Sequence, residues 1–224
     1  MAVRQRAIQA EDKEERNHAL LDAAERLMLR SPDRVPSVAE VADDAGLAKG
    51  TVYLYFPSKE ELLLALHERN VGGFFRALTA LLEGGERVDF DRVLSLTHEH
   101  IVAPPLFLPL ASRCFGMMSQ SIPEASAGAF KLRMAERLEH AGEGLERHFP
   151  ALARGQGLEL LRHSYALILG LWQMAGSAVC PAGSQGAVPA ALAFSYPDDL
   201  DRALRALWQG AMGAATGDAS RGAR

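Results

Sequence analysis

Apolar residues recur at intervals of three and four along most of the chain, and proline or glycine stands at nearly every break between the periodic segments. This spacing predicts helices, because no segment of useful length alternates between apolar and polar positions as a half-buried strand would. We therefore predict an all-α fold. The predicted helices cover residues 11–29, 38–45, 49–56, 58–84, 89–102, 106–119, 123–148, 158–179 and 197–212.

The stretch of residues 37–59 reads SVAEVADDAGLAKGTVYLYFPSK and predicts two short helices joined by a sharp turn. Ser37 and Glu40 have the spacing of a capping box, in which a hydroxyl and a carboxylate satisfy the unpaired amides at a helix start. Gly46 ends this helix, since glycine takes the left-handed conformation of such a turn without a steric penalty. A short helix, a glycine turn and a second exposed helix form a device for entering the DNA major groove.

The second helix of this stretch buries Val52 and Phe56 and therefore presents its other residues on or near its remaining faces. Two tyrosines and a threonine on those faces carry hydroxyls that can donate to phosphate oxygens. Leu54 and the methyl group of Thr51 are suited to contact thymine methyl groups. These side chains suit a helix that lies against DNA.

Pro57 ends the second helix, and Ser58 opens a third with another S-x-x-E capping box, to Glu61. This arrangement places Lys59 beside a helix N-terminus, where the helix dipole and the ammonium together favour an anion. A DNA phosphate is the natural candidate for that anion.

These residues, with the helix before them and the long helix after them, resemble the DNA-binding domain of the TetR family of bacterial transcriptional repressors. The specific part of the resemblance is the run KGTVYLYFPSKEEL at residues 49–62. Ala48 departs from the family, which often has a serine there, so the second helix lacks a hydroxyl cap at a cost on the order of 1 kcal/mol. Carried over by position, the resemblance implies that Lys49, Gly50 and Leu54 face base edges and that Ser37, Thr51, Tyr53, Tyr55 and Lys59 contact the DNA backbone.

The resemblance also implies an all-helical homodimer with an N-terminal three-helix DNA-binding domain and a larger C-terminal domain that binds a small-molecule effector. We expect the dimer to occupy a palindromic operator and the effector to favour a different separation of its two DNA-binding domains. The expected domains are a flexible arm at residues 1–12, a helix-turn-helix domain at 13–73, a ligand-binding and dimerisation domain at 74–212, and a disordered tail at 213–224.

Net charge is the feature that argues against nucleic-acid binding. The chain carries a formal charge of −4 at pH 7, and residues 1–60 hold nine basic and eleven acidic side chains. Binding then depends on where the charges lie. We expect Lys49 and Lys59 on the DNA side, whereas Asp43 and Asp44 belong to the first helix of the motif.

Aromatic and methionine side chains cluster in the predicted C-terminal helices. Most of them are expected to form core, although such side chains also adapt to irregular apolar ligands in pockets between helices. The candidates for lining an effector pocket are Phe107, Phe115, Met118, Phe130, Met134, Trp172 and Met174.

The segment YALILGLWQMAG at residues 165–176 is apolar almost all round, so one face must pack on its own subunit and the other on something else. A partner chain is the simplest answer, and two such helices from each chain would form a four-helix interface with two-fold symmetry. The alternative is a helix fully buried within a monomer. The interface candidates are Tyr165, Ile168, Gly170, Leu204, Leu207 and Trp208.

Two other interpretations stay open. The motif could be a helical hairpin in another all-α protein, or a scaffold retained by a helical small-molecule-binding protein or enzyme. Against an enzyme, His98 and His100 point about 200° apart on a helix and cannot chelate one ion from one face. We therefore predict no catalytic residues, no metal and no cofactor.

Two cysteines, Cys114 and Cys180, match neither a metal site nor a disulfide framework, and Cys114 is either a buried structural residue or a redox-sensing thiol. No apolar run reaches the ~20 residues of a membrane span. The N-terminus lacks an apolar signal region. We expect a cytoplasmic protein that does not bind membranes.

Overall fold

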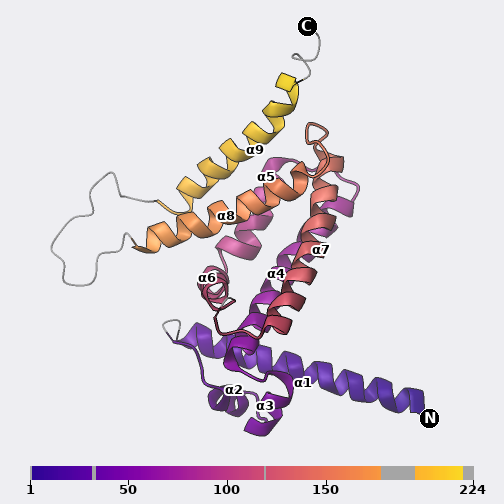
Figure 1. Ribbon diagram of the computed structural model, residues 1–224, viewed down its shortest axis with the longest axis vertical. Coiled ribbons are helices and arrows are strands. Elements are labelled where there is room, and N and C mark those ends of the chain that lie inside the picture. The colour runs from indigo at the N-terminus through magenta and orange to yellow at the C-terminus, as the bar shows by residue number, and fades with distance from the viewer. Residues whose placement is uncertain (1, 32–33, 119, 178–194, 219–224) are drawn as a thin grey trace, which may run out of the picture. The chain divides into compact units, whose positions relative to one another are not determined.

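The computed structural model describes residues 2–31, 34–118, 120–177 and 195–218, and all regular elements in these ranges are helical. The predicted all-α fold is therefore confirmed. The elements are α1 (Ala2–Arg30), α2 (Val38–Asp44), α3 (Lys49–Tyr55), α4 (Lys59–Glu83), α5 (Phe90–Thr97), the π-helical turn η1 (His98–Val102), α6 (Phe107–Met117), α7 (Glu124–His148), α8 (Gln156–Ser177) and α9 (Asp198–Asp218) (Figure 1).

Two helices extend further than their sequence patterns indicate. α1 begins at Ala2, within the segment expected to be a flexible arm, because the residues AVRQRAIQA are mostly good helix formers. α9 continues to Asp218, into the segment expected to be a disordered tail. The break between the predicted helices 158–179 and 197–212 lies almost entirely outside the described residues.

The chain forms two compact units. The N-terminal unit comprises Met1–Asn70 and Pro105–Ala127, and the C-terminal unit comprises Val71–Pro104 and Gly128–Arg224. This division differs from the expected one, since α6 groups with the N-terminal helices although its sequence lies within the predicted ligand-binding domain.

The core of the N-terminal unit explains why α6 belongs to it. Leu106, Leu110 and Cys114 are buried in one cluster with residues of α1, α2, α3 and α4. The ring of Phe107 meets that of His67 edge to face, with 5.6 Å between centroids. The buried members of the cluster are Leu20, Leu21, Ala23, Ala24, Met28, Val38, Val41, Ala42, Val52, Phe56, Leu62, Leu63, Leu66, Leu106, Leu110 and Cys114.

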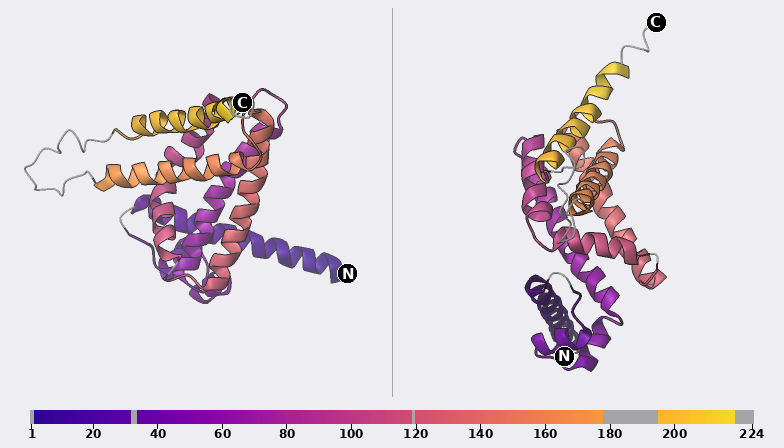
Figure 2. Two further views of the ribbon diagram at one scale, coloured as in Figure 1. Left: turned by 45° about the horizontal axis from the view of Figure 1, so that its top comes forward. Right: turned by 90° about the vertical axis from the view of Figure 1, so that its left-hand side faces the viewer.

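In the C-terminal unit, α8 and α9 lie side by side and antiparallel (Figure 1 and Figure 2). Trp208 of α9 is buried between Phe90 and Phe149, with ring centroids 5.4 and 5.5 Å away. Its indole Nε1 donates a hydrogen bond of 3.0 Å to Ser164 Oγ of α8, so the polar atom of this buried ring is satisfied. The tryptophan therefore joins α5, α8 and α9 into one core.

Two glycines allow the start of α8 to cross α7 at backbone contact. A Cβ atom on Gly142 would lie 2.7 Å from the backbone nitrogen of Leu158. A Cβ atom on Gly157 would lie 2.2 Å from the carbonyl oxygen of Gly142. The carboxylate of Glu146 also accepts hydrogen bonds from the amides of Gly155 and Gly157, at 2.8 and 3.0 Å. This crossing is sterically closed to side chains.

Within the described residues, no helix has the length and apolar character that crossing a membrane would require.

The Gly142 crossing can be tested by substitution. We expect Gly142→Ala to lower the free energy of unfolding by about 1–3 kcal/mol, because the added methyl group forces α7 and α8 apart. Gly128→Ala on the same helix is the matched control, since nothing lies within 4 Å of its Cβ position. The control should be neutral or slightly stabilising in urea unfolding. Equal stability of the two variants would contradict this account of the crossing.

His67 makes the stability of the N-terminal unit depend on pH. Burial lowers the pKa of His67 to about 4, whereas this histidine titrates near 6.5 in the unfolded state. The folded state therefore binds this proton at a lower pH than the unfolded state does. Stability should therefore fall as pH drops from about 6.5 toward 4, by about 1.4 kcal/mol per pH unit for this one proton. Urea unfolding at several pH values should show a smaller slope for His67→Gln than for the control His18→Gln, an exposed histidine of the same unit. Identical slopes would contradict the buried neutral histidine.

Candidate DNA-binding site

The start of α2 is fixed by the predicted capping box. Ser37 Oγ accepts from the amide of Glu40 at 3.3 Å, and Glu40 Oε2 accepts from the amide of Ser37 at 2.8 Å. The Arg34 guanidinium donates to both carboxylate oxygens of Glu40, at 3.0 and 2.6 Å, and these bonds lower the pKa of Glu40 to about 2. The prediction for Ser37 and Glu40 is confirmed. Sequence reasoning gave Arg34 no role at this helix start, because its partner is six residues away.

The turn between α2 and α3 has the predicted geometry. Gly46 has a φ of +67°, in the left-handed region that favours glycine. The amide of Gly46 donates to the carbonyl of Asp43 at 3.2 Å, and that of Leu47 donates to Ala42 at 2.9 Å. These bonds satisfy the last carbonyls of α2 and reverse the chain toward α3.

Four stripes of residues run along α3, as expected for a helix with 100° between successive residues. Val52 and Phe56 lie in the core. Gly50 and Leu54 lie on the opposite side, and Leu54 is 81% exposed. Each of the two intervening flanks carries one pair, Lys49 with Tyr53 and Thr51 with Tyr55.

The two flanks of α3 differ in exposure. Lys49 and Tyr53 are exposed, Tyr53 by 46%. Thr51 and Tyr55 are partly buried, and Tyr55 packs against the core of the N-terminal unit. The expectation of two exposed tyrosines therefore holds for Tyr53 and is wrong for Tyr55, because the flank that contains Tyr55 turns toward that core.

Both ends of α3 are formed without side-chain capping hydrogen bonds. Ala48 is the N-cap and contributes no side-chain hydrogen bond, as predicted, so the cap is made by the backbone bond from Thr51 to Ala48 at 2.8 Å. The helix ends at Tyr55, one residue earlier than predicted, because Phe56 takes an extended conformation with φ −132° before Pro57.

The start of α4 keeps half of the predicted capping box. Ser58 Oγ accepts from the amide of Glu61 at 3.1 Å. The Glu61 carboxylate is bound by hydroxyl groups, those of Ser58 at 3.2 Å and Ser126 at 2.6 Å. Lys59 is exposed, and its Nζ lies 3.7 Å from a carboxylate oxygen of Glu60.

Several basic side chains of the N-terminal unit are engaged by its own acids. Asp44 accepts from Arg26 at 3.0 and 2.7 Å and also from Arg30, and these bonds lower the pKa of Asp44. Arg69 pairs with Asp22 and Glu25, at 2.5 and 2.6 Å. These pairs engage three bases and three acids, so they leave the acidic excess of the unit unchanged, and their local effect is to neutralise Asp44 at the end of α2.

The predicted pocket residues divide between the two units. Phe107, Phe115 and Met118 belong to the N-terminal unit, where Phe107 is buried and Phe115 is 74% exposed. The others belong to the C-terminal unit, where Met174 is 52% exposed. The residues of the C-terminal group are Phe130, Met134, Trp172 and Met174.

Half of the predicted interface residues belong to the core of their own chain. Ile168, Leu204 and Trp208 are buried inside the C-terminal unit, which corrects their assignment to a dimer surface. The cause is that α9 has an inward stripe at four-residue spacing, which a sequence pattern cannot distinguish from an outward one. Tyr165, Gly170 and Leu207 are partly exposed.

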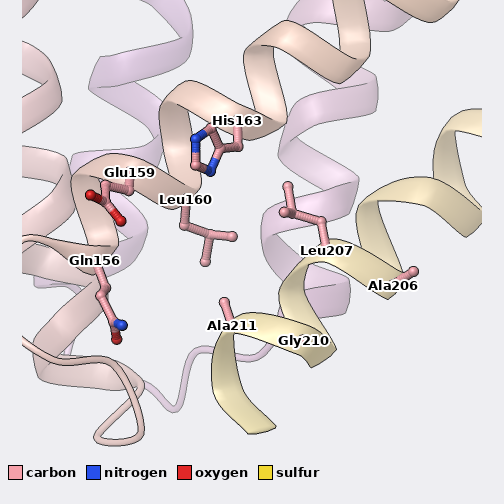
Figure 3. A pocket seen from close by; sticks show the side chains of 8 residues that line it. All are labelled: Gln156, Glu159, Leu160, His163, Ala206, Leu207, Gly210 and Ala211. Carbon is pink, nitrogen blue, oxygen red and sulfur yellow. The ribbon is translucent and has the colours of Figure 1, made fainter. Parts of the chain in front are cut away.

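A groove of about 360 Å³ runs between α8 and α9 (Figure 3). Figure 3 shows Leu160 of α8 and Leu207 and Ala211 of α9 around the space between the helices. The remaining lining residues are Gln156, Glu159, His163, Ala206 and Gly210.

Cys114 has the environment of a structural cysteine. It is buried in the N-terminal core, and its Sγ donates to the carbonyl of Leu63 at 3.7 Å. Burial raises the pKa of the thiol to about 12, so the reactive thiolate is scarce at neutral pH. This favours the structural role over the redox-sensing one.

The histidines considered for an active site have separate partners. His98 Nε2 lies 2.6 Å from Asp201 Oδ1, and His100 Nε2 lies 3.8 Å from its neighbour Glu99. The described part of the chain contains no group of three or more side chains placed to hold a metal ion.

A glycine turn that presents a short exposed helix on a three-helix core defines a helix-turn-helix protein. Residues 20–66 match the family model described as bacterial regulatory proteins of the TetR family, and residues 68–215 match the one described as tetracyclin repressor-like, C-terminal domain. The chain belongs to the TetR family, which confirms the resemblance inferred from its motif.

The chain is similar to curated regulator proteins over part of its length. The fatty acid metabolism regulator protein of Bacillus subtilis is 34% identical over 59 residues, which are 26% of this chain and 30% of that protein. The regulator EthR of Mycobacterium tuberculosis is 38% identical over 80 residues, 36% of this chain and 37% of EthR. The chain spans about a third of the length of these curated relatives.

The fold has a relative of known structure. The crystal structure of the reduced form of Escherichia coli NemR is similar, with a TM-score of 0.54 and 24% identity. The likeness covers 86% of this chain and 95% of NemR, and it supports the fold assignment.

Proposed function

We propose that the protein is a homodimeric repressor that binds a palindromic operator through α3 and leaves it when a small-molecule effector binds the C-terminal unit. The observation that carries this proposal is the face of α3 turned away from the core, where Leu54 is 81% exposed. A protein of this kind acts in the cytoplasm, where bacterial DNA lies.

The proposed contacts fall into two groups. Most side chains on the flanks of α3 and at neighbouring helix starts hold the DNA backbone, and the residues of the exposed side, together with Lys49 at the start of α3, read base edges. The backbone contacts are Ser37, Thr51, Tyr53, Tyr55 and Lys59, and the base contacts are Lys49, Gly50 and Leu54.

Charge is expected to contribute modestly to affinity. Arg26, Arg30 and Arg34 are already bound to Asp44 and Glu40, so they are not free to neutralise phosphates. Because the salt dependence of DNA affinity grows with the number of phosphates neutralised, we expect a shallow dependence for this protein.

Selection of bound DNA from a random pool tests the proposal. We expect a palindrome whose half-sites are about 34 Å apart, one turn of the duplex or a multiple of it. In a shift assay with that DNA, Lys59→Ala should weaken binding to all sequences alike, because phosphate contacts carry no sequence information. Lys49→Ala should instead change the selected sequence.

Tyr55→Phe extends this test, since it removes only the hydroxyl and keeps the ring that packs on the core. We expect lower affinity without a change of preferred sequence. Recovery of no preferred DNA at all would oppose the proposed function, and unchanged affinity of both Lys59→Ala and Tyr55→Phe would oppose the phosphate assignments.

We infer that the groove between α8 and α9 receives the same two helices of a second copy. On the α9 side its lining consists of alanine, glycine and leucine, which permit close helix packing, and Gly210 has open space around its Cβ position. Two helices from each chain form a four-helix, two-fold interface, whose symmetry matches a palindromic operator. Of the sequence candidates, Leu207 lines this groove, and Tyr165 and Gly170 are partly exposed elsewhere on α8.

Leu207→Glu tests the interface. We expect this variant to become monomeric in light scattering and to lose at least about tenfold in operator affinity, because one DNA-binding unit no longer tethers the other. Leu132→Glu is the control, since Leu132 is 70% exposed on α7 and does not line the groove. A dimeric Leu207→Glu protein, or a monomeric control, would contradict the assignment.

Effector release requires a difference in affinity. A ligand that binds the operator-bound and released conformations equally shifts nothing, whereas a coupling of roughly 1–3 kcal/mol changes operator affinity about 5- to 150-fold. The alternative, a helical enzyme or small-molecule-binding protein that keeps the motif as scaffold, has weaker support, because the exposed side of α3 has no function in it. We propose no catalytic activity.

A further inference from the structure

Gly50 is a glycine that its own fold does not require. It lies in the helical backbone of α3, and the glycines with positive φ among the described residues are Gly46, Gly85 and Gly155. A Cβ atom at Gly50 would meet no heavy atom within 4 Å, unlike one at Gly142. Glycine is also a poor helix former, so an alanine at this position would suit the free protein better.

Leu54, one helical turn after Gly50, is also unusual for its environment. It has the highest exposed fraction, 81%, among the large apolar side chains of the described residues. A single exposed leucine is ordinary on a protein surface, so exposure alone shows little. The position of Leu54 is more informative than its exposure, because Leu54 shares a stripe with Gly50 on the side of α3 opposite Val52.

The stripe made by Gly50 and Leu54 differs from the flanks of α3. The flanks carry the hydroxyls of Thr51 and Tyr53, which suit anionic phosphates. The central stripe offers no side-chain donor or acceptor, so its chemistry suits recognition by shape and apolar contact and not by side-chain hydrogen bonds. On the base edges of the major groove, the methyl group of thymine is the apolar feature.

We propose that Gly50 and Leu54 form one reading face, in which Gly50 leaves space for the close approach of the duplex and Leu54 packs on the 5-methyl group of a thymine. The operator half-site therefore contains a thymine at the position that Leu54 reaches. This inference rests on the proposed function and adds the identity of one base and the reason for the glycine.

Replacing thymine by uracil tests the methyl contact, since uracil lacks only that methyl group. In the selected operator, each thymine is replaced in turn in both half-sites, and affinity is measured by fluorescence anisotropy. One position should be sensitive, with a loss of about fourfold per methyl group and about fifteenfold for the pair, as expected for the burial of one carbon.

Leu54→Ala completes a double-mutant cycle. This variant should bind the thymine and uracil operators equally, because the side chain that senses the methyl group has gone. Equal sensitivity of wild type and Leu54→Ala, or no sensitive position, would overturn the thymine assignment. Failure to select any operator would instead count against the proposed function, so the two failures are distinguishable.

Gly50→Ala tests the other half of the face. We expect its melting temperature to equal or exceed that of wild type and its operator affinity to fall at least about tenfold, because the methyl group occupies space meant for DNA. Gly116→Ala on α6 is the matched control, as an exposed helical glycine of the same unit with nothing within 4 Å of its Cβ position. The control should keep operator affinity. Wild-type operator affinity for Gly50→Ala, or a loss of its stability, would overturn the role given to Gly50.

Discussion

Burial of Val52 and Phe56 is the constraint from which the rest of the N-terminal unit follows. These two side chains enter a core formed by α1, α2, α4 and α6, and so determine the rotation of α3 about its own axis. A seven-residue helix is too short to be stable alone in water, so tertiary packing must supply its stability. The same packing turns Gly50 and Leu54 outward. The rotation of α3 about its own axis therefore determines both which residues stabilise the unit and which residues are exposed for recognition.

Internal pairing neutralises Asp44 and Glu40 locally and leaves the net charge of the chain unchanged. Arg26, Arg30 and Arg34 satisfy Asp44 and Glu40, and in doing so they fasten α2 to α1 and to the segment before α2. Surface ion pairs of this kind contribute little energy each, so their main effect is on geometry and on the field near α3.

Local features were predictable from the sequence and assembly was not. The capping box of Ser37, the turn at Gly46 and the burial of Val52 depend on residues within one or two helical turns of each other. The inward face of Trp208 depends instead on α5 and on the end of α7, far away in the chain. The long start of α1 also escaped prediction, since it begins without a capping signal.

Because α6 belongs to the N-terminal core, two separate parts of the gene encode this unit. Leu110 and Cys114 form part of the wall against which Leu62, Leu63 and Leu66 are buried, yet they follow these leucines by more than forty residues. A fragment cut after residue 73 would leave that wall missing and its leucines in water. The DNA-binding unit is thus discontinuous in sequence. Recombination that exchanges only the first third of the gene between relatives would combine α1 to α3 of one protein with α6 of another, although these helices share one core.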